Sequence, residues 1–415
     1  MKILVALSLS SDIYSNIRID SGKDAVSISS DALSVSPLDK QVLAKALSAD
    51  AEVSAVSVCP AEGGRALRYA LAMGTPFVSR INNCPLDSYV AARGVSDFLK
   101  EHPADIILCG QAGWDYASGE FPGYLSELSG IGLLEDVSDF SVSGGGLYVT
   151  RQTDTRQQQL RVKTPVILAC TKAIYPEEQI RIPSMREMML SMRSPLPVRE
   201  GDENIFPKRT YRHYQMMPPR DAVRFFPADD YRVLADILRD ALEGKNKNAE
   251  NEEVSLFSGR ILAETESGDI PKSLPAETEL LSEEILPAHK NLHAAPVIVS
   301  GGMGVNPEAW KTIEKLAEFT GAAIGCTRPV YQAGIRPYFE HVGQTGAKVA
   351  PRLYVAAGIS GALQHIAGMV RSEKVLAINT DPRAEIFKYA DYGVVGDAGQ
   401  VLSGICEVLK SSSRK

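Results

Sequence analysis

The stretch Pro296-Val297-Ile298-Val299-Ser300-Gly301-Gly302-Met303-Gly304 decides the fold class of the C-terminal half. Its apolar run is typical of a strand buried on both faces, and glycines follow at once. A helix pattern then runs over Pro307–Thr320, with Trp310, Ile313 and Ala317 on one face. Further strands are expected at 353–355, 375–378 and 394–395, and helices at 362–370, 384–389 and 401–409. This alternation predicts a doubly wound α/β domain with a parallel sheet.

The first 175 residues show the same alternation. Continuous apolar runs predict buried strands at Ile3–Leu9, Val53–Val58, Ile106–Cys109 and Val166–Ala169. The sequence Ser36-Pro37-Leu38-Asp39 is a helix start, because serine can cap, proline fits the first turn and aspartate favours the helix dipole. Residues 139–163 predict two antiparallel strands around the turn Ser143–Gly146. The N-terminal half is therefore a second α/β domain.

The middle of the chain predicts little core. Residues 176–227 are proline-rich and read as an irregular arm over the surface, followed by a helix over about 229–242 that stops at Gly244. Residues 250–284 hold many more acids than bases, which indicates a solvated linker. We therefore expect a domain at 1–192, an arm, helix and acidic linker at 193–290, and a second domain at 291–415.

Composition excludes several classes of protein. The 415 residues carry 44 bases and 51 acids, a net charge of −7, without a lysine or arginine run, which argues against nucleic-acid binding. No apolar stretch approaches the roughly 18 residues that cross a membrane, and no secretory leader is visible. The six cysteines are scattered and form no CxxC pair, so we expect no metal site and a reducing, cytoplasmic setting.

Glycine and small polar residues follow each predicted strand of the C-terminal domain, at 300–304, 325–328, 356–361, 379–381 and 396–397. Ligands of such sheets bind beyond the carboxyl ends of the strands, so these segments should meet at one rim. Glycine turns let backbone N–H groups approach a phosphate. The common phosphate and nucleophile-elbow motifs are absent. Two side chains on this rim, Arg328 and His365, could act on a bound redox ring; either could equally be an ordinary surface or core residue.

With these motifs in place, residues 296–409 closely resemble the FAD-binding C-terminal domain of the electron transfer flavoprotein alpha subunit. The resemblance rests on Thr327-Arg328-Pro329, Val342-Gly343-Gln344-Thr345-Gly346, Gly358–Met369, Ala377–Pro382 and Ala390–Asp397. Residues 1–192 resemble the beta subunit more loosely, through Pro37-Leu38-Asp39, Leu71–Gly74, Asp105–Gly110 and Thr171–Met185. The chain thus looks like a beta–alpha fusion without the usual first domain of the alpha subunit. The resemblance implies an adenine nucleotide α-hydrolase-like N-terminal domain and a Rossmann-like C-terminal domain.

The resemblance implies a bound FAD, with no catalytic residues and no metal. The cofactor residues it implies are Thr327, Arg328, Val342, Gly343, Gln344, Thr345, Gly346, Ser360, Gly361, Ala362, Leu363, Gln364, His365, Asn379, Asp397 and Ala398. Arg328 would lie over the isoalloxazine ring, Thr345 near N5 and His365 near the C2 carbonyl, whereas Asn379 and Asp397 would hold the adenosine end. Because one-electron reduction places negative charge on the ring, Arg328, aided by His365, should stabilise an anionic semiquinone.

The sequence departs from the family at several positions. Met303 stands where an arginine is usual, Gln332 where an acid is common, and Ser36 where an asparagine is usual. The loop that holds AMP, or a second FAD in some members, here reads Asp115-Tyr116-Ala117-Ser118-Gly119-Glu120-Phe121-Pro122. Glu120 adds negative charge there and Pro122 removes an N–H donor, so a second nucleotide is doubtful.

The family works with partner proteins. The resemblance places Met185, within Arg181–Met192, at the loop that contacts a partner dehydrogenase; alternatively this is a surface helix with Met188, Met189 and Met192 packed inward. A peripheral contact with a membrane-bound oxidoreductase, a homodimer or a companion subunit would also fit. The leading hypothesis is an electron carrier. Two others stay open: a flavin enzyme that acts on a small substrate, and a flavin-free scaffold subunit.

Overall fold

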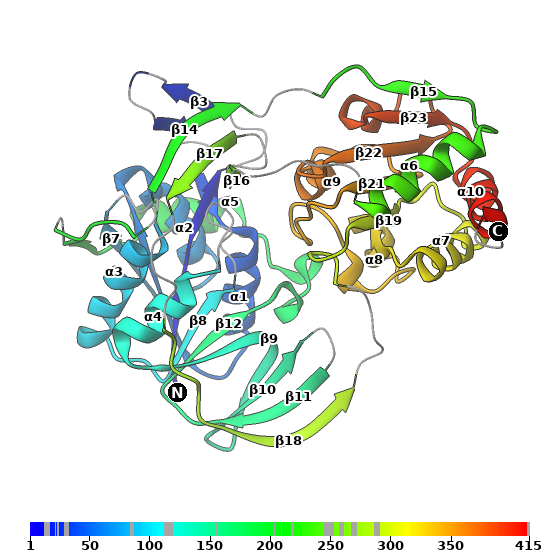
Figure 1. Ribbon diagram of the computed structural model, residues 1–415. Coiled ribbons are helices and arrows are strands. Elements are labelled where there is room, and N and C mark those ends of the chain that lie inside the picture. Colours follow the sequence, from blue (N-terminus) through cyan, green and yellow to red (C-terminus); the bar gives the residue numbers. More distant parts are fainter. Residues whose placement is uncertain are drawn as a thin grey trace. The chain divides into compact units, whose positions relative to one another are not determined.

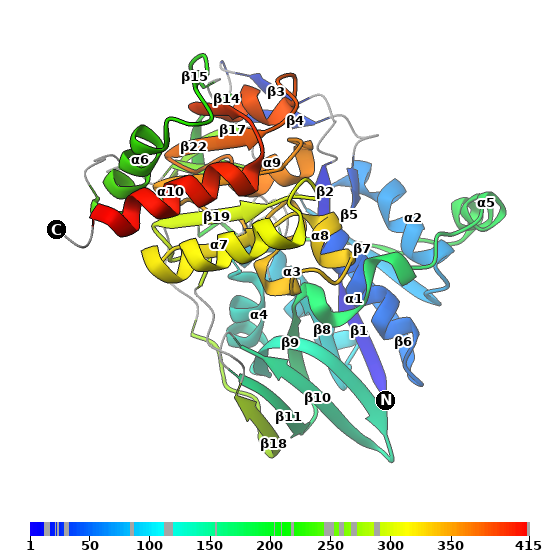
Figure 2. The same ribbon diagram turned by 90° about the vertical axis from the view of Figure 1, so that its right-hand side faces the viewer.

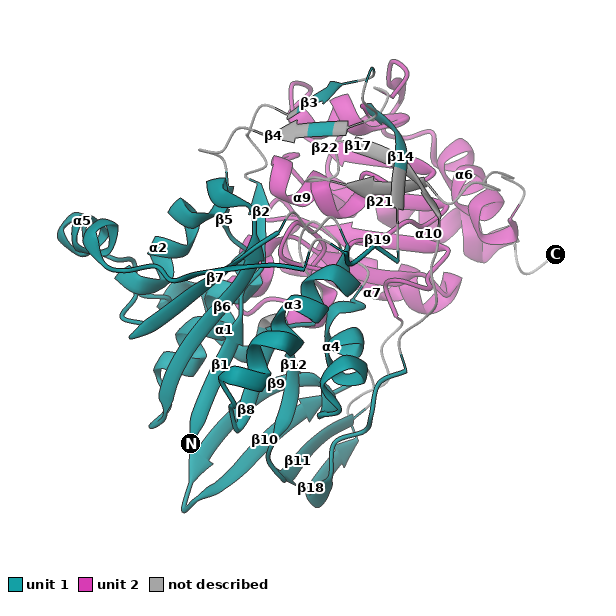
Figure 3. Cartoon of the chain, turned by 90° about the vertical axis from the view of Figure 1, so that its left-hand side faces the viewer, with its two compact units in different colours: residues 1–215, 256–287 teal, residues 216–255, 288–415 magenta. Residues whose placement is uncertain are grey.

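The computed structural model describes the chain except residues 12–16, 21, 23–24, 29–32, 84–86, 112–118, 154–155, 203, 209, 217–219, 245–252, 257–260, 267–271, 286–290 and 413–415. The chain forms two compact units (Figure 3). Unit 1 contains residues 1–215 and 256–287, and unit 2 contains residues 216–255 and 288–415. No helix among the described residues is long and apolar enough to cross a membrane.

Unit 1 is built on a ten-stranded sheet (Figure 1). Its parallel strands, in spatial order, are β13 (Val198–Glu200), β7 (Phe77–Asn82), β6 (Glu52–Cys59), β1 (Lys2–Ala6), β8 (Ile106–Gly110), β12 (Val166–Cys170) and β9 (Gly132–Ser143). Antiparallel strands β10 (Gly146–Gln152), β11 (Arg156–Val162) and β18 (Thr278–Ile285) extend it from β9. The four strands predicted as buried apolar runs all lie in its parallel part.

Helices cover both faces of this parallel sheet. Successive side chains of β1 point to opposite faces: Ile3 and Val5 pack in the core with α1 (Pro37–Leu47) and α2 (Gly64–Ala72). Leu4 and Ala6 pack in the core with α3 (Ser88–Glu101) and α4 (Phe121–Ser129). Ser36 caps α1 as predicted, since its side chain accepts a hydrogen bond from the backbone N–H of Asp39. The expected doubly wound α/β fold is confirmed.

Unit 1 also carries smaller elements. These are the strand pairs β2 (Leu9–Ser11) with β5 (Leu33–Val35) and β3 (Ile17–Asp20) with β4 (Ala25–Ile28), the 3₁₀ helices η2 (Ala61–Gly63), η3 (Lys172–Ile174) and η4 (Glu177–Gln179), and helix α5 (Met185–Arg193). The middle segment also forms a three-stranded sheet of order β14 (Thr210–Met216), β17 (Ile261–Glu266) and β16 (Glu253–Leu256), in which residues 216 and 253–255 count with unit 2.

Unit 2 is built on a six-stranded sheet whose strands are all parallel. The spatial order is β15 (Arg224–Phe226), β23 (Tyr392–Val395), β22 (Lys374–Asn379), β21 (Leu353–Ala357), β19 (Val297–Gly301) and β20 (Ala323–Cys326). One face packs against α6 (Tyr231–Glu243), α10 (Ala398–Ser412) and α7 (Pro307–Thr320), which lie side by side in Figure 2. The other face is covered by α9 (Leu363–Met369) and η6 (Glu385–Tyr389). The remaining short helices are α8 (Arg328–Gln332) and η5 (Tyr338–Glu340).

The middle segment is more ordered than the sequence suggested. The predicted irregular arm contains α5 and strands β13, β14 and β15, and residues 216–244 belong to unit 2. In the acidic segment, β18 pairs with β11, and acids of this segment meet bases on β11 or just beyond it. Arg156 lies 3.2 Å from Glu283, and Lys163, just beyond β11, lies 2.5 Å from Glu277. The excess of acids in residues 250–284 is visible in the sequence, whereas the bases that they face in the folded chain are not.

Candidate functional site

A cavity of about 450 Å³ lies at the carboxyl ends of the sheet in unit 2. Residues that follow four different strands line it: Gly302 after β19, Thr327 after β20, Gly358 after β21 and Asn379 at the end of β22. Of the five glycine-rich or polar segments predicted to meet at one rim, four therefore line the same cavity. The fifth segment, at 396–397, lines another groove.

The cavity gathers more than half of the predicted site residues. Those in its wall are Thr327, Arg328, Val342, Gln344, Thr345, Ser360, Ala362, Gln364, His365 and Asn379. Those outside its wall are Gly343, Gly346, Gly361, Leu363, Asp397 and Ala398. Asp397 instead lines an open groove with Asn306 and Lys311, where its Oδ1 accepts a hydrogen bond from the backbone N–H of Gln400 at the start of α10.

Close backbone contact between two glycine turns forms the floor of the cavity. The Gly304 N–H donates to the Gly358 carbonyl across 3.1 Å. A Cβ atom at Gly302 would lie only 2.3 Å from that same carbonyl oxygen. Gly358 has φ +60, a conformation that favours glycine. The glycines in these turns are therefore required by the close approach of the loops after β19 and β21.

The loop at 341–349 is closed on itself and tied to α9. The Gly343 N–H donates to the Ala347 carbonyl (3.2 Å), and the Gln344 N–H donates to the Gln364 carbonyl (2.6 Å). The Val342 N–H donates to the carbonyl of Cys326, which fixes the loop to the end of β20. These bonds hold the Gln344 and Thr345 side of the loop in the cavity wall.

Arg328 supplies positive charge to the cavity. It is the first residue of α8, separated from β20 only by Thr327, and is half-buried. The Thr327 N–H donates to the Gly301 carbonyl across 3.1 Å, which holds this turn beside β19. Among the described residues that line the cavity there is no aspartate or glutamate. The site therefore suits an anionic ligand with an apolar part, because Val342, Ile359 and Ala362 share its wall with the guanidinium.

His365 is held by the protein at both ring nitrogens. Its Nδ1 lies 2.9 Å from the Val342 carbonyl oxygen and its Nε2 lies 3.0 Å from the Tyr354 hydroxyl. Burial lowers the pKa of His365 to about 4, so the ring is neutral at pH 7. Any help that His365 gives Arg328 therefore comes from its position in the cavity wall and not from a charge on the ring.

His341 is a residue of the cavity wall that the sequence analysis missed. It is buried, and its ring centroid lies 4.7 Å from that of Tyr331. A Cβ at Gly346 would lie 2.7 Å from its Nδ1, so the imidazole packs directly on the glycine loop. The available signal was its place immediately before Val342–Gly346, at a strand-like bridge with Cys326.

Comparisons with known proteins agree with this geometry. The family model for the electron transfer flavoprotein domain matches residues 25–195, and the model for the electron transfer flavoprotein FAD-binding domain matches residues 291–370. Together the two matches cover more than half of the chain. The chain belongs to the electron transfer flavoprotein family. The predicted resemblance is confirmed, and the cavity lies largely in the part that matches the FAD-binding domain.

Individual relatives match the C-terminal part. The electron transfer flavoprotein alpha subunit of Bacillus subtilis is 48% identical over 121 residues, 29% of this chain and 37% of that protein. Protein FixB of Azotobacter vinelandii is 43% identical over 150 residues, 34% of this chain and 41% of that protein. The mitochondrial alpha subunit of Oryza sativa subsp. indica is 49% identical over 120 residues, 29% of this chain and 34% of that protein. The chain thus spans less than half the length of these relatives.

The loop predicted from the resemblance to hold a second nucleotide lies in unit 1. Residues 115–118 of the predicted loop lie outside the described residues. Glu120 is at the N-cap position of α4 and Pro122 is in the first turn of that helix. At the strand ends nearby, the buried carboxylate of Asp39 accepts hydrogen bonds from the backbone N–H groups of Ser8 (2.8 Å) and Gly110 (3.2 Å). These amides, at the ends of β1 and β8, are therefore already engaged by a side chain.

Helix α5 contains the residue predicted to contact a partner protein. Met185, Met189 and Met192 are 79%, 62% and 53% exposed, whereas Met188 is partly buried. The alternative of three methionines packed inward is therefore wrong for Met189 and Met192. A capping box between Ser184 and Glu187 begins the helix. At its other end, the Arg68 guanidinium donates to the carbonyl of Ser194 (2.9 Å) and also to that of Ser191. The apolar surface of α5 therefore belongs to a helix that is fixed at both ends.

Proposed function

We propose that this chain is an electron carrier that binds one FAD in the cavity of unit 2 and passes electrons between a dehydrogenase and a downstream acceptor. The observation that carries the proposal is the cavity itself. It combines an arginine, backbone turns and apolar side chains at the strand ends, within the segment that matches the FAD-binding domain. In this proposal Arg328, Thr345 and His365 lie near the isoalloxazine ring, and Asn379 near the adenosine end.

The proposed carrier works in a reducing compartment such as the cytoplasm. The five cysteines among the described residues are free thiols, and all of them are buried. Burial raises the pKa of the Cys59 thiol to about 11 and of the Cys326 thiol to about 12. These thiols are therefore protonated at neutral pH and act as core residues, which fits a chain that needs no disulfides.

The first test is the visible absorption spectrum of the purified full-length chain, before and after stepwise reduction by a one-electron donor. We expect a flavin spectrum, one FAD per chain after denaturation, and a one-electron-reduced form that accumulates during the titration. A colourless chain that cannot be reconstituted with FAD would instead support the scaffold alternative. Turnover of a small substrate without any partner protein would support the enzyme alternative.

The same denaturation experiment decides the second nucleotide. We propose that unit 1 holds no AMP or second FAD, because the Asp39 carboxylate takes the amides of Ser8 and Gly110 and Pro122 lacks an N–H group. Quantification of released nucleotides should give FAD only. Stoichiometric AMP, or more than one FAD per chain, would contradict this part of the proposal.

We also propose that α5 docks on the partner dehydrogenase through Met185. A fixed helix that exposes several methionines is an apolar patch of the kind used for protein contacts. The Met185→Ala variant should slow electron transfer from the dehydrogenase while the FAD content stays unchanged. Met216→Ala, which removes a methionine that is 51% exposed on β14, is the matched control. Equal rates for both variants would remove α5 from the contact.

A further inference from the structure

A buried tyrosine, Tyr354, contacts His365, one of the two histidines in the cavity wall. Tyr354, on β21, is fully buried, and its hydroxyl lies 3.0 Å from His365 Nε2. The carbonyl of Val342 lies 2.9 Å from His365 Nδ1. A carbonyl can only accept a hydrogen bond, so Nδ1 carries the proton, and in a neutral ring Nε2 then accepts from the Tyr354 hydroxyl.

We propose that Tyr354 is a positioning residue for the cofactor cavity, which holds His365 in one orientation and one tautomer through the hydrogen bond to Nε2. This inference rests on the proposed binding of FAD. Both ring nitrogens are engaged by the protein, so the imidazole keeps a fixed orientation in the cavity wall. The positive charge that a reduced ring meets from these two side chains then belongs to Arg328 and not to His365.

The protonation states agree with this direction of the hydrogen bond. Burial raises the pKa of Tyr354 far above its usual value, so its hydroxyl stays protonated and can donate. Burial also lowers the pKa of His365, so the ring keeps a lone pair on Nε2. The Tyr354 hydroxyl is therefore the donor and His365 Nε2 the acceptor in this hydrogen bond.

The first test reads the tautomer directly. The full-length chain labelled with ¹⁵N-histidine has six histidines, and the His365→Gln variant identifies the signals of His365. We expect a neutral ring at pH 7 with a protonated Nδ1 and an unprotonated Nε2. A protonated Nε2, or a ring that titrates with an unshifted pKa, would overturn the inference whether or not FAD binds.

The second test separates a positioning role from a merely structural one. Tyr354→Phe keeps the ring but removes the donor, so the Nε2 signal should shift and the pKa of His365 should rise. The FAD dissociation constant should increase at least threefold. Tyr392→Phe is the matched control and should change none of these, because Tyr392 lies two strands away on β23 with its ring against Phe226.

The outcomes of the second test are distinguishable. A native chain that binds no FAD would remove the proposed function. A native chain that binds FAD, with an unchanged FAD affinity in Tyr354→Phe despite a shifted Nε2 signal, would remove only the positioning role. If Tyr354→Phe does not fold, the tautomer of the native protein still decides the hydrogen bond on which the inference depends.

Discussion

The guanidinium of Arg220 lies 2.5 Å from the carboxylate of Asp391, and both side chains are largely buried. Arg220 also donates to the carbonyls of Val370 and Ser372, just beyond the end of α9. Asp391 Oδ2 accepts a further hydrogen bond from the backbone N–H of Val375, at the start of β22. Arg220, from the middle segment, thus supplies hydrogen-bond donors to polar groups at one edge of the six-stranded sheet, next to edge strand β15.

Arg220→Ala should destabilise unit 2 by about 2 kcal/mol, because the carbonyls of Val370, Ser372 and Glu373 lose their guanidinium donor. The largely buried Asp391 carboxylate then keeps only Lys374 and the Val375 N–H as partners. The measurement is chemical denaturation followed by a probe of unit 2, such as flavin fluorescence. Arg239→Ala is the matched control. It removes an exposed pair with Asp236 on α6 and should cost at most about 0.5 kcal/mol. Equal losses in the two variants would show that the Arg220 pair does not stabilise this edge.

Arg328→Ala should lower the first reduction potential of the bound FAD while the fold stays intact. A cation about 4 Å from a unit charge is worth up to about 4 kcal/mol at an effective dielectric near 20. We therefore expect at least a tenfold loss in the one-electron equilibrium constant, about 59 mV or more, and a lower yield of the one-electron-reduced form. Stepwise reduction with a reference dye measures both quantities.

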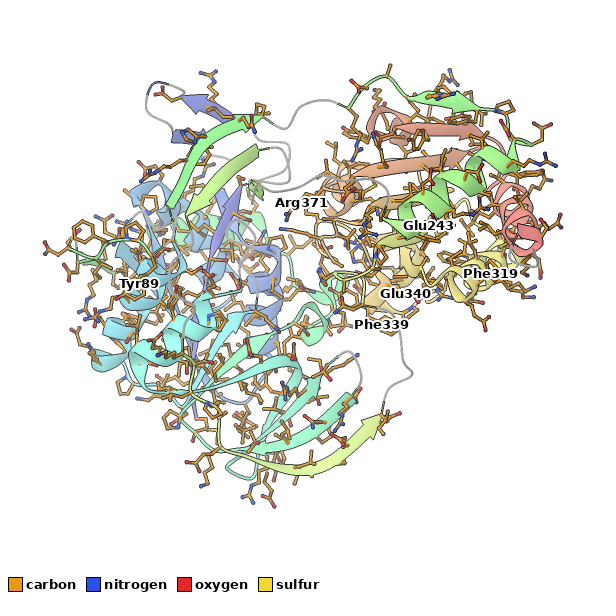
Figure 4. The ribbon with its side chains drawn as sticks, viewed as in Figure 1. Tyr89, Glu243, Phe319, Phe339, Glu340 and Arg371 are labelled. Atoms are coloured by element: carbon orange, nitrogen blue, oxygen red, sulfur yellow. The ribbon has the colours of Figure 1, made fainter. Side chains whose placement is uncertain are left out.

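Arg371→Ala is the charge-matched control for Arg328→Ala, because it removes an exposed arginine of unit 2 (Figure 4). His365→Gln should change the first potential less than Arg328→Ala, since the imidazole is already neutral. A native potential in Arg328→Ala would refute the charge role of the guanidinium. An equal loss in His365→Gln would restore a charge role for the histidine.

Gly368→Ala should displace the loop that carries Gln344 and Thr345. A Cβ at Gly368 in α9 would lie 2.3 Å from the Gly343 nitrogen and 2.5 Å from its Cα, and backbone atoms cannot rotate away. We expect a loss of about 1–3 kcal/mol in stability and at least a tenfold weaker binding of FAD, measured by fluorescence titration. In Gly64→Ala the nearest atom is a side-chain carbon at 3.6 Å, so this control in α2 should keep native affinity. Unchanged FAD binding in Gly368→Ala would separate the loop from the site.

Local signals in the sequence were sufficient for much of the fold. Helix α7 spans Pro307–Thr320 as predicted, since its cap, apolar stripe and terminal Gly321 all lie within the segment. Strand β7 was not predicted, because Arg80 interrupts its apolar run. The buried guanidinium of Arg80 donates to Asn82 Oδ1 in the same strand (2.8 Å) and to the Cys59 carbonyl (3.0 Å), a partner that only the folded sheet supplies.

The site was predictable where glycine and polar residues follow strands directly. The rim formed by Gly302, Thr327 and Gly358 has this pattern. Features that depend on tertiary contacts were not visible in one sequence. The neutral state of His365 depends on its burial, and its tautomer on the position of the Val342 carbonyl. Around the 333–341 segment, Arg336 forms a two-pronged ion pair with buried Glu340, beside exposed Phe339 (Figure 4).

The burial of His365 should make the stability of unit 2 depend on pH. Its pKa is about 4 in the folded protein, against about 6.5 in the unfolded chain. Between these values the unfolded chain binds the extra proton, so stability falls as the pH decreases from about 6.5 to about 4. Below about 4 both states are protonated and this contribution changes no further. The full loss is on the order of 3 kcal/mol, since one pKa unit corresponds to about 1.4 kcal/mol.

Denaturation of the native chain and of His365→Gln across this range isolates the contribution, because carboxylates titrate alike in both proteins. We expect the difference in unfolding free energy between the two proteins to shrink or reverse toward pH 4. The native chain loses stability through protonation of its unfolded His365, and the variant has no such group. Parallel pH profiles would mean that the imidazole is not buried in its neutral form.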